Sequence, residues 1–285
     1  MRAVAVAALA LLAAGSAAAA PAGARKKDLA RPPASDVSTP RLDPRLQAAI
    51  ADPSRPAADR GRDMWRHPAE SLAFWGVKPG ATVVDLQPGG GYWTYILAPY
   101  LKATGGKYVA AGGLRGKDAF LGKFTDPRYG AVDYAEFSMT NGPIVPAGTA
   151  DVVMSTREFH NWVRAKNADK WMADAYAALK PGGVFAFEEH RGDGSAVKTD
   201  GTAGYMKTDD VIAAAQKAGF RLAARSEINA NPKDTKDHPF GVWTLPPSKF
   251  TTANGQGSDP AFDRTKYDAI GESDRMTLRF EKPRA

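Results

Sequence analysis

The sequence of 285 residues contains no cysteine. Disulfide bonds are therefore excluded, and so is a lipidated cysteine of the kind that follows the leader of a bacterial lipoprotein. A chain of this length has enough residues to bury the core of one large domain without such cross-links.

A second absence is an uninterrupted apolar run of about 20 residues, the length that a membrane-spanning helix needs. The nearest candidate is the run 4–14, which follows Arg2 and leads into small residues over 15–24. A basic start, a short apolar stretch and small residues are typical of a secretory signal, with an uncleaved anchor as the alternative. We predict a signal peptide over 1–22, a flexible linker over 23–43, and an exported, periplasmic protein without a membrane anchor after cleavage.

A concentrated stripe of one charge is also missing. The formal net charge is +7, but the basic residues are scattered, apart from the three at 25–27. Nucleic-acid binding requires a clustered basic surface, so we predict no nucleic-acid partner and a small-molecule substrate. The oligomeric state does not follow from the sequence.

Short apolar runs alternate with helical patterns through most of the chain. Helical spacing occurs over 92–102, 167–179 and 208–218. The runs that predict strands are 82–86, 106–111, 132–139, 150–155, 184–188, 221–228 and 276–280. This alternation is typical of an α/β fold, and we predict one domain over 44–285 with a doubly wound, mostly parallel, seven-stranded Rossmann-like sheet.

Two regions depart from this alternation. Helical spacing over 44–51 and 57–75 predicts N-terminal helices that cap one end of the sheet, with Met64, Leu72 and Trp75 buried. The stretch 230–275 is rich in proline, glycine and charge. Loops of this length are uncommon and often bind ligands, although a surface insertion is the alternative.

A glycine turn follows the first predicted strand. The strand runs into Gly89, Gly90 and Gly91 and then into a helix. Glycine permits unusual backbone angles and close approach of a ligand, and ligands of doubly wound sheets bind beyond the carboxyl ends of strands. The turn is therefore a candidate ligand cradle, with an ordinary loop as the alternative.

Three segments carry a family resemblance. Asp85 with the glycine turn, the segment from Asp151 (Asp-Val-Val-Met-Ser-Thr) and the segment from Leu179 (Leu-Lys-Pro-Gly-Gly-Val-Phe) resemble the successive motifs of class I S-adenosylmethionine-dependent methyltransferases. The chain also resembles a poorly characterised group of exported predicted methyltransferases, over about 44–283. The hallmarks of that group are Pro-Gly-Gly-Gly-Tyr-Trp from Pro88, Phe-His-Asn-Trp from Phe159, Asn-Ala-Asn-Pro-Lys-Asp-Thr from Asn229 and Gly-Val-Trp-Thr-Leu-Pro-Pro from Gly241.

The resemblance implies a set of residues that contact S-adenosylmethionine. These are Asp85, Gly89, Gly90, Gly91 and Tyr92, with Asn141 against the adenine by its position after the third strand. Two departures weaken the expected binding of this cofactor. Gln87 replaces the first glycine of the family pattern, and the second strand ends in Gly112 and Gly113, where the family has an acid that binds the ribose hydroxyls.

Polar side chains follow the fourth and fifth predicted strands. Glu158 and His160 come after one, and Glu189 and His190 after the other. Histidine is suited to general base catalysis because its unperturbed pKa is about 6.5, so we predict His160, His190 and Glu158 as catalytic residues. The alternative for His160 is a structural hydrogen bond. No metal ligands are predicted, because no tight spacing such as H-E-x-x-H occurs.

These observations favour a methyltransferase that acts on an unknown small molecule. A binding protein that has kept the fold and lost the reaction is the second hypothesis, because the ribose acid is missing. A metal-assisted hydrolase that uses the His and Glu side chains is the third. No Asn-Pro-Pro-Tyr-like segment follows the fourth strand, so methylation of adenine or glutamine nitrogen is not indicated.

Overall fold

The computed structural model describes residues 42–284. The predicted signal peptide over 1–22 and all but the last two residues of the predicted linker lie outside the described residues. Within 42–284, no helix has the length and apolar character that crossing a bilayer requires.

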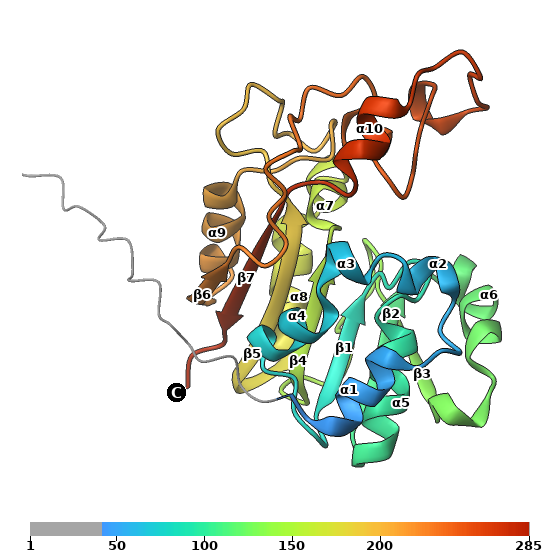
Figure 1. The fold of residues 1–285 in the computed structure, drawn as a ribbon. Coiled ribbons are helices and arrows are strands. Elements are labelled where there is room, and N and C mark those ends of the chain that lie inside the picture. Colours follow the sequence, from blue (N-terminus) through green and yellow to red (C-terminus); the bar gives the residue numbers. More distant parts are fainter. Residues whose placement is uncertain (1–41, 285) are drawn as a thin grey trace, which may run out of the picture. The chain divides into compact units, whose positions relative to one another are not determined.

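A seven-stranded sheet in the order β3-β2-β1-β4-β5-β7-β6 forms the centre of the fold (Figure 1). Its strands are β1 (Thr82–Leu86), β2 (Lys107–Gly112), β3 (Val132–Glu136), β4 (Ala150–Thr156), β5 (Leu179–His190), β6 (Arg221–Ser226) and β7 (Arg275–Glu281). The first five strands pair in parallel, and β7 runs antiparallel to both β5 and β6. The predicted doubly wound, mostly parallel sheet is confirmed, and its strand order reverses between β1 and β4.

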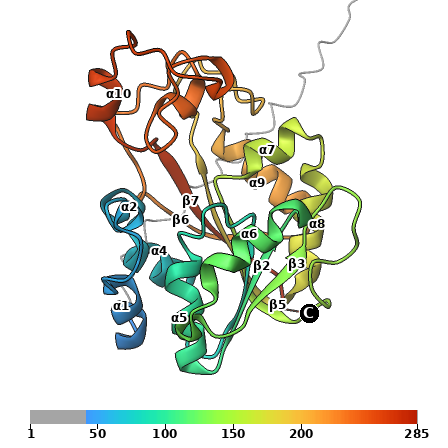
Figure 2. The same ribbon diagram turned by 90° about the vertical axis from the view of Figure 1, so that its right-hand side faces the viewer.

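Helices cover both faces of the sheet (Figure 2). The α-helices are α1 (Pro44–Ala51), α2 (Ala57–Arg60), α3 (Asp63–Arg66), α4 (Pro68–Trp75), α5 (Thr94–Thr104), α6 (Lys117–Leu121), α7 (Phe159–Arg164), α8 (Ala168–Ala178), α9 (Thr208–Lys217) and α10 (Thr265–Ile270). The 3₁₀ helices are η1 (Leu114–Gly116), η2 (Gly122–Phe124), η3 (Pro127–Tyr129), η4 (Gly241–Thr244) and η5 (Ala253–Gly255). One core cluster contains residues of α7, α8 and α9, and the other contains residues of α1, α4, α5 and α6.

The alternation of side chains along β1 distributes its residues between these two clusters. Val84 and Leu86 belong to the cluster under α7 to α9, whereas Val83 belongs to the opposite one. Because successive side chains of a strand point to opposite faces, Asp85 shares the face of Val83. A parallel strand buried on both faces is nearly all apolar, so a fully buried aspartate in β1 is an exception that needs a role.

The N-terminal helices differ from the prediction in two respects. α1 and α4 pack on one face of the sheet, in the cluster that contains α5, and do not cap its end. Leu72 and Trp75 are buried, and the indole Nε1 of Trp75 donates to the carbonyl oxygen of Leu278 at 3.2 Å. Met64, however, is 67% exposed. The predicted continuous helix is interrupted, because His67 adopts a left-handed conformation with φ 42° between α3 and α4. The helical period on which the prediction for Met64 depended does not extend across that break.

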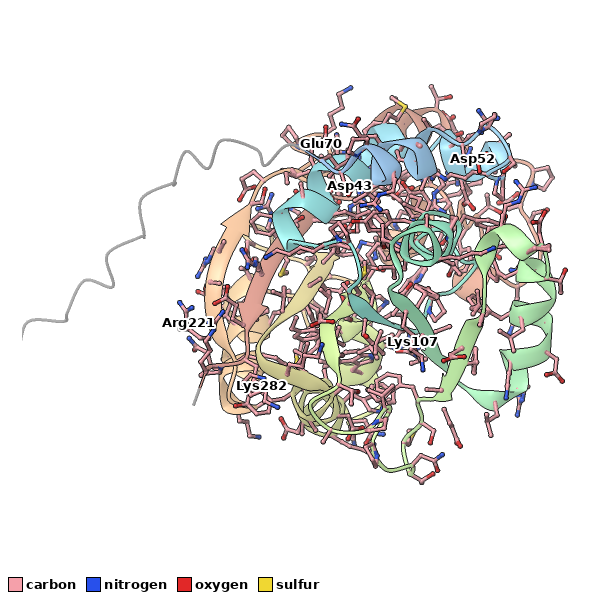
Figure 3. The ribbon with its side chains drawn as sticks, turned by 90° about the horizontal axis from the view of Figure 1, so that it is seen from below. Asp43, Asp52, Glu70, Lys107, Arg221 and Lys282 are labelled. Carbon is pink, nitrogen blue, oxygen red and sulfur yellow. The ribbon has the colours of Figure 1, made fainter. Side chains whose placement is uncertain are left out.

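The two ends of the sheet differ in character. The segment 230–275 folds over the carboxyl ends of the parallel strands, where it contributes α10 (orange and red at the top of Figure 1). The opposite end, seen in Figure 3, presents exposed basic side chains such as Lys107 and Arg221. A hollow of about 840 Å³ lies at that end beside Lys180, Arg221 and Lys282.

Candidate functional site

A hollow of about 240 Å³ lies where β1, β4 and β5 end. Ligands of doubly wound sheets bind at this edge, beside the point where the strand order reverses. The residues that line the hollow are Asp59, Arg62, Arg66, Gln87, Pro88, Gly89, Gly90, Tyr92, Trp93, Thr156, Arg157, Glu158, His160, Asn161, His190, Val242, Trp243, Pro246, Pro247, Ser248, Glu272 and Ser273. The long loop therefore forms one wall of the hollow, and α2 and α3 contribute to another.

The glycine turn after β1 opens toward free space at two of its three glycines. A Cβ atom placed on Gly89 or Gly90 would have no heavy atom within 4 Å. A Cβ atom on Gly91 would lie only 2.5 Å from the ring of Phe124, and the φ of Gly91 is 95°. Gly89 and Gly90 thus form the open cradle, whereas Gly91 allows the close packing of Phe124.

We expect Gly91→Ala to destabilise the fold and Gly90→Ala to leave its stability nearly unchanged. The first change combines a strained backbone with overpacking and should cost about 1–3 kcal/mol. The second adds a methyl group in open space and should stay within about 0.5 kcal/mol. Urea unfolding of the two variants measures the difference, and equal midpoints would contradict this assignment of the two glycines.

Asp85 lies behind this turn in a chain of buried hydroxyl groups. Its Oδ2 accepts from the hydroxyl of Tyr108 at 2.8 Å, and the hydroxyls of Tyr108 and Thr94 are 2.7 Å apart. Among the described residues, its Oδ1 has no hydrogen-bond partner. Burial raises the pKa of Asp85 to about 7, against the opposing hydrogen bond from Tyr108. Asp85 is therefore a carboxyl that is costly to ionise and has one free oxygen atom.

We expect the stability advantage of Asp85→Asn over the natural chain to grow as the pH rises. The folded-state pKa of about 7 lies above the ordinary value of 3.8, so the stability that Asp85 contributes is complete below pH 3.8 and is lost by about pH 7. Asparagine does not ionise, and its side-chain oxygen still accepts from Tyr108. The difference between the two unfolding free energies should change by about 4 kcal/mol from pH 4 to pH 8. A difference that does not vary with pH would show that Asp85 is not a perturbed group.

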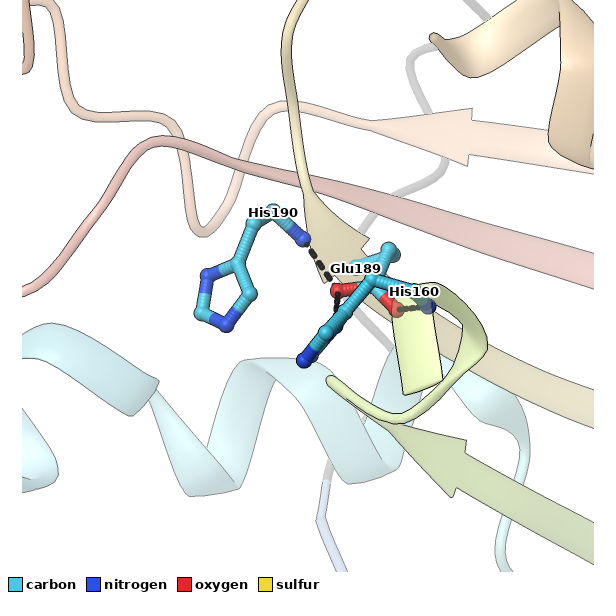
Figure 4. A group of neighbouring side chains, drawn as sticks. All are labelled: His160, Glu189 and His190. Atoms are coloured by element: carbon cyan, nitrogen blue, oxygen red, sulfur yellow. Dashed lines mark hydrogen bonds and ion pairs between the residues drawn. The ribbon is translucent and has the colours of Figure 1, made fainter. Parts of the chain in front are cut away.

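His160, Glu189 and His190 form a cluster on one side of the hollow (Figure 4). Oε2 of Glu189 accepts from the backbone N–H of His160 at 3.0 Å, and Oε1 lies 3.1 Å from Nδ1 of the same histidine. The backbone N–H of His190 donates to the same Oε1 at 2.8 Å. The two imidazole centroids are 5.5 Å apart. The buried carboxylate of Glu189 thus fixes the side chain of His160 and the backbone of both histidines.

The pKa values of the three predicted catalytic residues diverge. Burial lowers the pKa of His160, but the Glu189 carboxylate outweighs that effect, so the pKa lies above its usual value. Burial and the neighbouring charge of His160 hold the pKa of His190 well below its usual range. Burial raises the pKa of Glu158 to about 7. Such divergence among neighbouring groups is typical of acid–base sites.

Beneath the hollow, two buried glutamates bind several arginines. Glu272 accepts Arg62 at 2.6 Å and Arg275 at 2.8 Å, and Glu188 accepts Arg157 at 2.7 Å. Longer ion pairs join Arg66 to Glu272 and Arg275 to Glu188, both at 3.4 Å. This network connects α3, the strand ends and the long loop, so it fixes the walls of the hollow.

The departures from the family pattern have a structural basis. Gln87 has a φ of 53°, and its Oε1 accepts from the indole of Trp162 at 2.7 Å, which ties the turn to α7. At the end of β2, a Cβ atom on Gly112 would lie 2.5 Å from the hydroxyl of Tyr134, and that hydroxyl donates to the carbonyl of Gly113. Tyr134 therefore closes the space beside Gly112, whereas a Cβ atom on Gly113 would have no heavy atom within 4 Å.

The structure brings most of the predicted site residues together. Gly89, Gly90, Tyr92, Glu158, His160 and His190 all line the hollow. Asp85, Gly91 and Asn141 are not among the lining residues. Asn141 lies in the loop after β3, where its backbone N–H donates to the hydroxyl of Ser138.

The sequence does not predict the second wall of the hollow, to which α3 and the long loop contribute. Arg62 and Arg66 are far from Glu272 in the chain, and no local pattern indicates that they meet. Trp243 belongs to the Gly-Val-Trp-Thr-Leu-Pro-Pro segment, but that segment does not indicate that Trp243 reaches this wall. The sequence places Glu189 beside His190, but it does not indicate that Glu189 binds His160. His238 lies in the loop 230–275, like Trp243 and Glu272. Its Nε2 is 2.8 Å from Oδ1 of Asp234, and His238 does not line the hollow.

Solved structures share this architecture. A SAM-dependent methyltransferase from Aquifex aeolicus is 19% identical with a TM-score of 0.51, over 60% of this chain and 89% of that one. The chain has the fold of class I methyltransferases. The cyclase SpnF is also similar, at 15% identity and a TM-score of 0.50, over 80% of this chain and 82% of that one. No family model and no curated protein matches the chain.

The methyltransferase fold by itself does not decide the reaction, because function resides in sites built onto a fold. The site must therefore be tested against S-adenosylmethionine directly. The open cradle at Gly89 and Gly90 fits the close approach of the methionine part of that cofactor. The end of β2 offers only glycines, Gly112 and Gly113, to the ribose hydroxyls. The fit is thus confined to one part of the cofactor.

Proposed function

We propose that this chain is an S-adenosylmethionine-dependent methyltransferase that acts on a small molecule bound in the hollow. The observation that carries the proposal is the open glycine cradle, which faces the same hollow as Glu158, His160 and His190. Fold similarity supports it. Asp85, Gly89 and Gly90 would hold the cofactor, which supplies an activated methyl group.

The chain's own contribution is to align the acceptor and to remove its proton. Methyl transfer depends mainly on the alignment of donor and nucleophile. Glu158 is the best-placed proton acceptor, because it lines the hollow and its Oε2 accepts from the side-chain amide of Asn161 at 3.0 Å, which fixes its orientation. Arg62 and Arg66, on the opposite wall, are held by Glu272 and suit a polar acceptor.

The proposal includes the cellular setting. Residues 1–22 have the pattern of a secretory signal, so we propose that the mature chain acts in the periplasm, without a membrane anchor and without a nucleic-acid partner.

Calorimetric titration of the purified chain with S-adenosylmethionine tests the proposal. We expect binding by the natural chain and its loss in Gly90→Val, because the new side chain would fill the open cradle. Gly142→Val is the matched control, since Gly142 also faces open space but lies in an exposed loop after β3. No binding at millimolar cofactor would remove the proposal.

One observation favours a second candidate function. The end of β2 carries Gly112 and Gly113 and no acid that could bind ribose hydroxyls, so the chain is also a candidate for a binding protein that has kept the methyltransferase fold and lost catalysis. Native mass spectrometry of the purified chain distinguishes the two. Recovery of a ligand other than S-adenosylmethionine, displaced by Gly90→Val, would favour the second candidate.

A further inference from the structure

We propose that His160, Glu189 and His190 bind a divalent transition-metal cation of the zinc class at the wall of the hollow. One ligand atom from each residue lies within 4.8 Å of the others. Two imidazoles and one carboxylate form the ligand set of several catalytic zinc sites, which keep a further position open. The inference does not depend on methyl transfer.

The geometry is fixed by neighbouring strand ends. β4 pairs with β5 up to Thr156 and Glu188, so the segment after β4 and the end of β5 emerge side by side. His160 lies in the first turn of α7, and Glu189 and His190 are the last two residues of β5. All three therefore rest on regular elements, and rigid support is what a metal site requires.

The separation of the ligand atoms suits a cation. Nδ1 of His160 and Oε1 of Glu189 lie 3.1 Å apart. Two ligands at bond lengths of about 2.0–2.1 Å around a tetrahedral centre lie about 3.3 Å apart. A cation can thus replace the proton shared by these two atoms, and metal binding would release that proton. Nδ1 of His190 lies 2.5 Å from the hydroxyl of Ser273, and one nitrogen of this ring is within 4.8 Å of the ligand atoms of His160 and Glu189.

The surroundings provide the outer support and the open side. Glu189 accepts the backbone N–H groups of both histidines, so its carboxylate is held without any metal. The nearby cationic side chains do not oppose a metal strongly, because Glu188 and Glu272 pair with Arg157 and Arg275. His160 and His190 line the hollow, so water or an acceptor oxygen can take the remaining position. A cation there would polarise such an oxygen beside Glu158.

Titration of the full chain, stripped by a chelator, with Zn²⁺ or Co²⁺ tests the proposal. We expect one equivalent of metal to bind, a visible Co²⁺ spectrum of low-symmetry nitrogen and oxygen ligation, and higher thermal stability in the presence of Zn²⁺. His190→Gln and Glu189→Gln should each weaken binding at least tenfold. His67→Asn is the control, because His67 lies outside the cluster and bonds Asn229.

The outcomes separate this proposal from the proposed function. Absence of stoichiometric binding, or equal binding by the natural chain and His190→Gln, would overturn the metal site. Thermal unfolding without metal checks that each variant is folded, and the Co²⁺ spectrum of Glu189→Gln gives a second reading. Titration of the metal-free chain with S-adenosylmethionine is independent, so either proposal can fail while the other holds.

Discussion

Glu272→Gln is expected to lower the free energy of unfolding by about 3–5 kcal/mol. Glu272 is 3% exposed and accepts Arg62, Arg66 and Arg275. Glutamine keeps the shape and some hydrogen bonds but removes the negative charge. The buried positive charge of Arg66 would then lose its carboxylate, and Arg275 would keep only Glu188 at 3.4 Å. Removing one partner of a buried network is far more costly than the network's net contribution.

Glu281→Gln provides the matched control. Glu281 also pairs with two arginines, Arg221 and Arg279, but its side chain is 24% exposed at the opposite end of the sheet. Exposed ion pairs contribute about 0–1 kcal/mol, so this variant should unfold close to the natural chain. Urea unfolding measures the stability of both variants. We expect the slope of the unfolding free energy against urea concentration to stay unchanged. Equal midpoints for the two variants would mean that the network under the hollow does not stabilise the fold.

Glu158→Gln is expected to lower turnover by about two to four orders of magnitude with little change in cofactor affinity. The carboxylate of Glu158 lines the hollow and is oriented by Asn161. Glutamine retains that hydrogen bond but cannot accept a proton. The acceptor is found first, by screening small molecules for release of S-adenosylhomocysteine by the natural chain.

The control for this prediction is Glu70→Gln, an exposed glutamate of α4 that does not line the hollow (Figure 3). Cofactor binding is measured by calorimetry for both variants. If Glu158→Gln turned over at the natural rate, the proton would have to leave through an imidazole or through no protein group. Asn161→Ala should lower the rate less than Glu158→Gln, because Asn161 only positions the carboxylate.

The sequence predicted the sheet well because the central strands are buried on both faces. Runs such as Val152 to Met154 are apolar because both of their faces are buried in a parallel sheet, and the glycines after β1 mark a turn between a strand and a helix. The exceptions arose where tertiary contacts override local pattern. Met64 is exposed because His67 breaks the helix, and α7 was not predicted because its six residues give too short a period.

The sequence by itself determined the strand alternation, the glycine turn at the end of β1 and the positions of the histidines after β4 and at the end of β5. Each of these features depends on residues that are neighbours in the chain. Only the tertiary structure decided that Glu189 holds His160, that Glu272 binds Arg62, and that Tyr134 covers the end of β2 at Gly112. These contacts join residues distant in the chain, and their partners are chosen by how the elements pack. The local sequence pattern does not indicate which distant residues become partners.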